Sequence, residues 1–347
     1  MTPEQIEGED WRSVSTRAHD EASLELARQR AVEPNRGRKA KRPSQIPVRG
    51  WKDILLRVFW ALPQDRVITT AGGVAFFALM AVFPGLATIV SLYGLISDPN
   101  VIGKHLNLLA GILPSGVLDL FSDQLVRIAK QSTGTLSTAS SLSLLIAFWS
   151  SNSGVSALFD ALNVIYKERE KRSIVRFYAT TFLFTMSGIV FALAAISMVV
   201  VLPIVLDRLG FASATDMALR IARWPALLII VGLGLSATYR YGPSRREAKW
   251  RWVTWGGSLA AFLWVCTSAG FSWYVASFDS YNRTYGSLGA IIGFMTWIWL
   301  SVVIVLLGAE LNSEMERQTA QDSTEGHPKP LGARRAFVAD TVGPTQS

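Results

Sequence analysis

Long hydrophobic segments separated by polar loops dominate the chain from residue 68 onward. A helix needs about 20 apolar residues to cross a bilayer core, because lipid offers no partners for its backbone polar groups. The pattern predicts six transmembrane helices, at residues 68–96, 138–165, 177–206, 221–238, 253–278 and 287–311. We therefore expect an all-α polytopic membrane protein, in which a bundle of six transmembrane helices forms one membrane domain over residues 51–315.

The remaining segments are too polar to cross a bilayer. Residues 51–62 and 101–132 have helical periodicity interrupted by charges, which predicts amphipathic surface helices. Residues 1–50 and 316–347 are predicted to be disordered tails, since the first of them mixes acids and bases without apolar periodicity. The basic cluster RGRKAKRP at residues 36–43 suits anionic lipid headgroups; it lacks the interleaved aromatic residues typical of a nucleic-acid site, so no nucleic-acid partner is expected.

Composition and charge agree with the membrane interpretation. The 347 residues are 50% hydrophobic and 17% charged, below the quarter or so that is typical of soluble domains. Basic residues are retained on the cytoplasmic side, and loops 166–176 and 240–252 contain five each. The opposite loops, 98–137, 207–220 and 279–286, contain three, two and one. This bias predicts that both termini are cytoplasmic, as six crossings also require.

No catalytic or cofactor-binding motif is recognisable. The three histidines, His19, His105 and His327, lie in separate segments and predict neither a metal cluster nor a Ser/His/Asp arrangement. The residues around Gly103 do not complete a phosphate-binding loop. Cys266, the sole cysteine, lies in an apolar segment and cannot form an internal disulfide. We expect no enzyme activity, no metal and no cofactor.

Polar residues inside a membrane helix are costly and are the default place to look for function. In the second predicted span, Asn152, Ser156, Asp160 and Asn163 lie within an arc of about 80°, and Glu310 ends the sixth span on the same side of the membrane. One interpretation is that these groups hold helices together. The other is a polar pathway for a solute or a proton.

The sixth span begins with small residues. Gly286, Gly289 and Gly293 offer surfaces that let another helix approach closely. They predict tight packing within the bundle or in a homo-oligomer.

Several motifs together resemble the YihY/BrkB family of bacterial inner-membrane proteins. They are Arg251–Val253, the segment from Tyr281 to Gly289, Gly308–Asn312, and the stretches AFFALMAVFPGL and GVSALFDALNVIY. The resemblance implies six helices and a place in the bacterial inner membrane. It also brings the old family label ribonuclease BN, which the scattered histidines disfavour, and links to serum resistance and export.

Three functions are compatible with these features. We expect a transporter or exporter, not driven by ATP, of an anionic or amphiphilic solute or an envelope lipid. Its polar pathway would have an outer mouth formed by Tyr281, Asn282, Arg283 and Tyr285. The alternatives are a structural or scaffold protein of the envelope and, least favoured, a nuclease. The expected partners are membrane lipid and an unknown solute.

Overall fold

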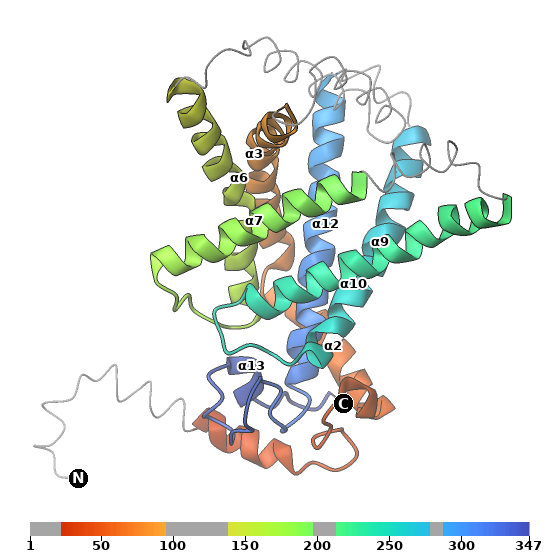
Figure 1. Ribbon diagram of the computed structural model, residues 1–347. Helices are drawn as coiled ribbons and strands as arrows, with labels where there is room; N and C mark the ends of the chain where they lie inside the picture. The colour runs from red at the N-terminus through yellow and green to blue at the C-terminus, as the bar shows by residue number, and fades with distance from the viewer. Residues whose placement is uncertain (1–21, 95–137, 197–212, 278–286, 347) are drawn as a thin grey trace, which may run out of the picture.

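The computed structural model describes residues 22–94, 138–196, 213–277 and 287–346, which form an assembly of α-helices (Figure 1). The long helices are α3 (Val67–Gly94), α6 (Thr138–Ile165), α7 (Ile174–Ile196), α9 (Ser213–Tyr241), α10 (Trp250–Ser277) and α12 (Ser287–Glu316). The short elements are η2 (Pro43–Gln45), α2 (Val48–Gln64) and α13 (Phe337–Asp340). Within these ranges there is no strand, only an isolated antiparallel bridge between Ala248 and Thr324. The predicted all-α class is confirmed.

Each of the six predicted spans overlaps one long helix, and α9 begins eight residues earlier than the predicted segment. Among the described residues, two segments are long and apolar enough to cross a membrane: Ile174–Phe191 of α7 and Ile292–Glu316 of α12. A third candidate combines α2 with residues Val67–Val82 of α3, which are bent by 62° relative to each other. Six crossings therefore remain a prediction, while helices at the six predicted positions are observed.

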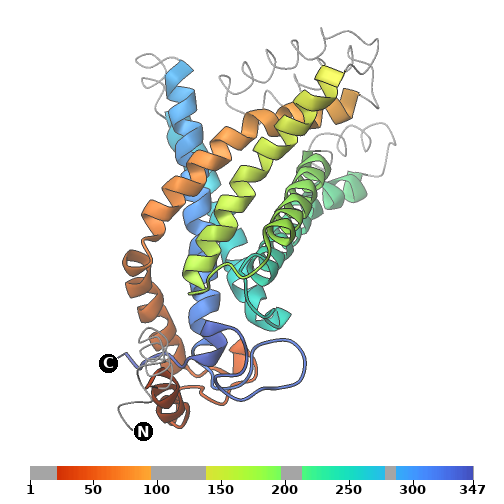
Figure 2. The same cartoon turned by 90° about the vertical axis from the view of Figure 1, so that its left-hand side faces the viewer.

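Helix α12 joins two groups of helices. It packs against α3, which pairs with α6, and against α10, which pairs with α9; α7 packs on the outer side of α6. Figures 1 and 2 show α12 running through the middle of the molecule, with α3 and α6 side by side. The order of neighbours is thus α7, α6, α3, α12, α10 and α9.

Small residues permit the closest contacts between these helices. A Cβ atom placed on Gly154 would lie 3.1 Å from the Cα of Ala78, where α6 meets α3. A Cβ on Gly256 would lie 2.1 Å from the carbonyl oxygen of Gly308, where α10 meets α12. The backbones approach in the way that small residues allow in membrane helices.

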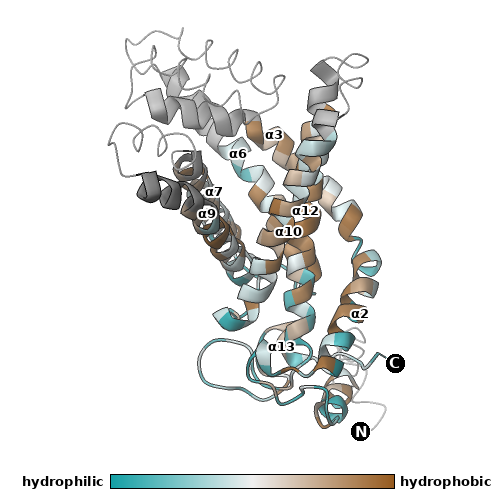
Figure 3. Cartoon of the chain, turned by 90° about the vertical axis from the view of Figure 1, so that its right-hand side faces the viewer, coloured by the Kyte–Doolittle hydropathy of each residue, from teal (hydrophilic) through white to brown (hydrophobic). Residues whose placement is uncertain are grey.

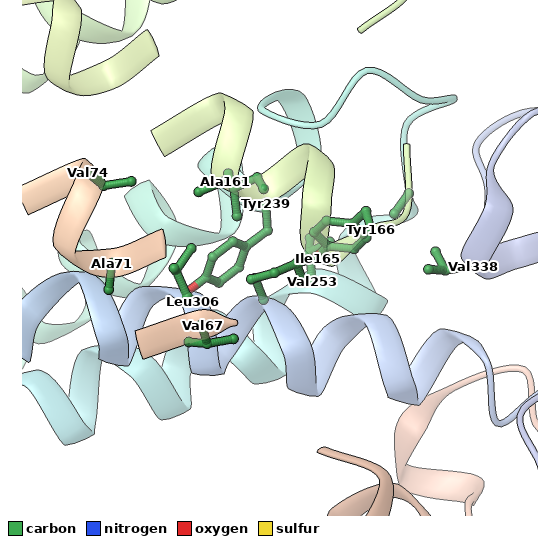
Figure 4. Close-up of a cluster of buried hydrophobic side chains, with 13 residues drawn as sticks. Val67, Ala71, Val74, Ala161, Ile165, Tyr166, Tyr239, Val253, Leu306 and Val338 are labelled. Carbon is green, nitrogen blue, oxygen red and sulfur yellow. The ribbon is translucent and has the colours of Figure 1, made fainter. Parts of the chain in front are cut away.

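The main hydrophobic core lies where most of the helices converge (Figure 4). Its buried members come from α3, α6, α9, α10, α12 and α13, and include Ala71, Leu162, Tyr239 and Leu306. The hydroxyl of Tyr239 donates a hydrogen bond of 2.7 Å to the carbonyl of Val305, which satisfies the one polar atom of this side chain. The core therefore includes the C-terminal segment through α13.

Residues 22–50 and 317–346 gather at one end of the helices together with loops 166–173 and 242–249; we call this the capped end (Figures 1 and 3). The prediction of disordered tails is wrong for these described residues. Arg38 donates to the carbonyls of Gln318 at 3.2 Å and Gly343 at 2.8 Å, and Thr319 and Val338 are fully buried. The remainder of the predicted tails, residues 1–21 and 347, lies outside the described residues.

The tails fold because their charges find partners at the helix ends. Arg57 of α2 lies 2.5 Å from Glu314 of α12 and also donates to Gln318 at 2.7 Å and to the carbonyl of Pro344 at 3.0 Å. Arg36 pairs with the buried Asp53 at 2.6 Å. Such contacts offset a shortage of apolar residues, which a composition-based argument for disorder does not consider.

Helix α2 is amphipathic, as predicted. Ile54 and Val58 pack into a second core cluster with Met315, whereas Leu55 and Phe59 on the other side are 58% and 63% exposed. An exposed apolar face of this kind suits contact with lipid. The second predicted surface helix, residues 101–132, lies outside the described residues.

Candidate functional site

A groove of about 570 Å³ opens between α3, α6 and α7. Its lining residues combine the polar stripe of α6 with an aromatic wall: Phe76, Phe77 and Met80 of α3, Trp149, Ser150, Asn152, Ser153, Ser156, Ala157 and Asp160 of α6, and Tyr178 of α7. Trp149 and Asp160 are eleven residues apart, which places them on nearly the same face of α6 and about 16 Å apart along its axis. The groove is therefore aromatic at one end and acidic at the other.

Asn152 connects α6 to α7. Its side chain is buried, donates to the hydroxyls of Thr181 at 3.0 Å and Ser156 at 3.2 Å, and accepts a hydrogen bond of 2.9 Å from Thr185. The Thr181 hydroxyl also donates to the carbonyl of Tyr178, and the single Thr185 proton is shared between Asn152 and the carbonyl of Thr181. Asn152 thus lines the groove and holds its wall together.

Replacing Asn152 by Leu should reduce the free energy of unfolding by about 1–2 kcal/mol, since three hydrogen bonds between or within helices are lost while volume is retained. Equilibrium unfolding of the purified protein in mixed detergent micelles measures this. The matched control is Ser187→Ala on α7, where an exposed hydroxyl bonds only to the carbonyl of Leu183. Equal stability of both variants would contradict the role of Asn152.

Asp160 lies at the acidic end of the groove. Its side chain is exposed and, among the described residues, accepts no hydrogen bond and forms no ion pair. The nearest base, Arg172, is held by Glu170 through contacts of 2.8 and 2.7 Å, and it donates to the carbonyl of Gly242 at 2.9 Å. Asp160 is therefore available to a ligand.

Asn163, the last residue of the predicted stripe, is not part of the groove lining. It is buried at the capped end, where it accepts a hydrogen bond of 2.7 Å from the backbone of Ser244 and donates to Glu170 at 3.1 Å. Burial opposes ionisation of Glu170, but the bonds from Arg172 and Asn163 prevail and lower its pKa to about 2. Asn163 thus joins two loops and holds them in place.

Glu310 does not line the groove either. It is 1% exposed, lies within hydrogen-bonding contact of Asp65 at the bend between α2 and α3, and has one carboxylate oxygen without a partner among the described residues. Lys167, directly after α6, forms an ion pair with Asp65. The predicted polar pathway is therefore divided: Asn152, Ser156 and Asp160 share the groove, whereas Asn163 and Glu310 lie at the capped end.

The predicted outer mouth lies outside the described residues; it consists of Tyr281, Asn282, Arg283 and Tyr285. Gly286 lies outside them as well. Gly289 is in the first turn of α12, without described surroundings. A Cβ on Gly293 would meet no atom of the described residues within 4 Å. The packing role of these three glycines remains a prediction, and the close contacts observed include those at Gly154, Gly256, Gly257 and Gly308.

The sequence argument missed the aromatic wall. Trp149 lies three residues before Asn152, about one turn toward the N-terminus of α6, so its helical spacing could have identified it. Phe76, Phe77 and Met80 come from a different helix, and only the contact of α3 with α6 brings them to the stripe. Asp65 was equally hidden, because it is far in sequence from Glu310.

Among the described residues, no three His, Cys, Asp or Glu side chains are placed to hold a metal ion. The groove itself presents one carboxylate, and the close pair of Asp65 and Glu310 is engaged by Lys167. The chemistry that the described groove can offer is thus recognition by charge, hydroxyl groups and aromatic faces.

Comparison with known proteins decides the family. The model of the virulence factor BrkB family matches residues 58–332, which include all six long helices. The chain belongs to the virulence factor BrkB family. The predicted family is therefore confirmed. No solved structure matches the chain.

The relatives of this BrkB family member extend over most of its length. It is 28% identical to the putative ribonuclease-like protein YfkH of Bacillus subtilis over 254 residues, covering 70% of this chain and 88% of the relative. A UPF0761 membrane protein of Cronobacter sakazakii is 26% identical over 80% of this chain and 94% of its own length. The UPF0761 membrane protein VP0125 of Vibrio parahaemolyticus is 29% identical, with 74% and 80% covered. Two of these three relatives of the BrkB-type chain are named membrane proteins.

Proposed function

We propose that this BrkB family member is a bacterial inner-membrane protein that carries an amphiphilic molecule, a lipid or a lipid-like solute, between the two leaflets along the groove of α3, α6 and α7. The movement is not driven by ATP. The proposal includes no catalytic reaction, no cofactor and no nucleic-acid partner.

Six crossings are part of the proposal. Their support is the overlap of six long helices with six hydrophobic segments of the sequence. Loops 166–173 and 242–249, which are rich in basic residues, both lie at the capped end, together with residues 22–50 and 317–346. Because basic loops stay inside, we assign the capped end and both termini to the cytoplasm.

The observation that carries the transport proposal is Asp160, a carboxylate on the polar stripe of α6, exposed to an open groove and without a described hydrogen-bond or ion-pair partner. A charge within a membrane helix is costly, and where it occurs it faces a bundle interior or a pathway. A purely structural carboxylate would be paired with a base, as Asp53 is with Arg36. The open carboxylate of Asp160 favours a ligand.

The aromatic wall supports an amphiphile as that ligand. Phe76, Phe77 and Trp149 are 50%, 47% and 58% exposed, although they line the same groove as Asp160. A small polar solute would gain nothing from these faces, while an alkyl chain would be shielded by them. A groove with one polar and one aromatic end suits a molecule of the same character.

A scaffold function is the alternative, and specific contacts favour it. Asn152 joins α6 to α7 through a buried hydrogen bond, and Asn163 joins the end of α6 to the loop that contains Ser244. Glu310 is buried at a helix junction. These groups hold helices and loops in place. The alternative therefore depends on whether Asp160 is also only structural.

Leaflet exchange in proteoliposomes separates the two functions. The full-length chain is reconstituted with tail-labelled fluorescent phosphatidylethanolamine, tail-labelled phosphatidylglycerol or a fluorescent single-chain alkylammonium, and dithionite reports the labels that reach the outer leaflet. We expect exchange of at least one probe with the wild type and about tenfold slower exchange with Asp160→Asn, since a contact made to the moving ligand is lost.

Glu247→Gln is the matched control, because it also removes a half-exposed carboxylate but lies in the loop before α10, away from the groove. It should exchange probes like the wild type. If none of the three probes moves with well-folded protein, or if Asp160→Asn is as active as Glu247→Gln, the transport proposal fails and the scaffold function is favoured.

A further inference from the structure

We infer that the groove of α3, α6 and α7 is a site for the positively charged ammonium end of an amphiphile, with Asp160 facing the ammonium and the aromatic wall covering the alkyl chain. This inference deepens the proposed function and takes its location from it, but it concerns binding and can be tested without transport.

Charge selects a cation at this site. Asp160 is the one charged residue among the described residues that line the groove. The bidentate contact of Arg172 with Glu170 neutralises the nearest base, and the ring of Phe159 lies 5.5 Å below its guanidinium. The charge that lines the described groove is therefore negative, which disfavours an anionic headgroup. Of the solutes expected from the sequence, anionic or amphiphilic, this inference favours the amphiphilic one.

The aromatic faces suit the apolar chain of the ligand. Trp149 and Tyr178 lie with ring centroids 5.0 Å apart on adjacent helices, and Phe76 and Phe77 add exposed faces from α3. Because Trp149 lies about 16 Å from Asp160 along α6, this end of the groove covers the alkyl chain, while the carboxylate provides the charge for the ammonium group. A hard metal cation instead needs six or more oxygen ligands, whereas the groove offers one carboxylate beside hydroxyl and amide groups.

The register along α6 matches a molecule with one polar end. Asp160 is five residues from Ile165, the end of the helix, hence about 7.5 Å from the capped end. Trp149 lies about 16 Å farther along the axis, away from that end. An amphiphile bound this way has its ammonium near the interface and its chain toward the middle of the membrane, which is the orientation of a lipid in the cytoplasmic leaflet.

Direct binding tests the inference. Tagged full-length protein in dodecyl maltoside micelles is incubated with radiolabelled dodecyltrimethylammonium, and bound label is measured by scintillation proximity. We expect saturable binding that dodecyl sulfate does not displace, and about tenfold weaker binding by Asp160→Asn. Asp160→Glu, which keeps the charge, should restore most of the affinity, and Glu247→Gln should bind like the wild type.

A second variant separates the two ends of the groove. In Trp149→Ala, the gain in affinity from octyl- to dodecyltrimethylammonium should fall, because the far end of the chain loses its cover, while the preference over dodecyl sulfate should persist. A variant that merely unfolds would lose both properties, and monodisperse gel filtration of each variant guards against that. Equal binding of dodecyl sulfate, or full binding by well-folded Asp160→Asn, would overturn the inference.

Competition identifies the source of the ammonium. Displacement by phosphatidylethanolamine but not by its N-acetylated form, which lacks the positive charge, points to a membrane lipid; displacement only by single-chain ammonium compounds points to a soluble amphiphile. Both results support the site. Cation binding without leaflet exchange would leave this inference standing and remove the proposed function, whereas exchange of phosphatidylglycerol that depends on Asp160, without saturable cation binding, would do the reverse.

Discussion

Gly256→Ala should reduce the free energy of unfolding by about 3 kcal/mol, at the upper end of the usual cost of overpacking. The added Cβ would lie 2.1 Å from the carbonyl oxygen of Gly308 and 2.6 Å from the amide of Asn312. One of these atoms is backbone and cannot rotate away. Helices α10 and α12 must therefore separate, and the gap would break the two hydrogen bonds by which Asn312 joins them. Its side chain accepts a hydrogen bond of 2.9 Å from the Gly256 N–H and donates one of 3.1 Å to the Val253 carbonyl.

The same helix provides the control. Gly270 of α10 has no described atom within 4 Å of a Cβ, so Gly270→Ala should leave stability unchanged or raise it slightly through better helix propensity. Both variants are compared by equilibrium unfolding in mixed micelles of dodecyl maltoside and dodecyl sulfate. If Gly256→Ala and Gly270→Ala were equally stable, the close contact of α10 with α12 would not exist in the protein.

The positions of the long helices could be predicted from the sequence because hydrophobic length is a local property. Segments such as 138–165 and 253–278 coincide with α6 and α10 to within three residues. The N-terminal end of α9 was missed because residues 213–220 include Asp216 and Arg220, which a hydropathy argument excludes from a span. Helix formation continues through such residues, since the backbone hydrogen bonds do not depend on side-chain polarity.

Features that depend on distant pairs could not be predicted in this way. The contact of Glu310 with Asp65 joins residues that are far apart in the sequence of the membrane domain, and the C-terminal segment folds because Arg38 and Arg57 supply donors to its carbonyls. Polar composition alone predicted disorder there, since it counts charges without knowing their partners. Helical spacing likewise identified the polar stripe of one helix, but it could not show that Asp160 lines the groove while Glu310 lies at the capped end.

Glycine patterns were similarly ambiguous. The run containing Gly289 and Gly293 stood out in the sequence, yet the observed backbone approaches use Gly154, Gly256 and Gly308. A small residue permits a close approach and does not require one, so the choice among many glycines depends on which helices are neighbours.

Glu316→Gln should have a comparable effect at the capped end, lowering the free energy of unfolding by about 3–5 kcal/mol because it leaves the charge of Arg245 buried without a counterion. Both side chains are fully buried, their closest atoms are 2.7 Å apart, and Arg245 lies 4.3 Å from the centroid of the Tyr166 ring. Burial disfavours the charged guanidinium, but the Glu316 carboxylate more than offsets this and raises the pKa of Arg245 above its ordinary value. Arg245 therefore stays charged, and Glu316→Gln replaces the carboxylate that it contacts by a neutral amide.

Two comparisons show whether the loss comes from an unpaired buried charge. The double variant Arg245→Gln/Glu316→Gln removes both charges and should recover part of the stability lost in Glu316→Gln. Glu247→Gln removes a half-exposed partner of Arg240, which keeps its contact with Glu325, and should cost less than about 1 kcal/mol. Glu316 also accepts a hydrogen bond of 2.7 Å from Ser323, so limited proteolysis within residues 317–346 should accelerate in Glu316→Gln. Faster proteolysis with unchanged global stability would mean that the pair holds only the C-terminal segment, and a double variant less stable than the single one would refute the buried-charge explanation.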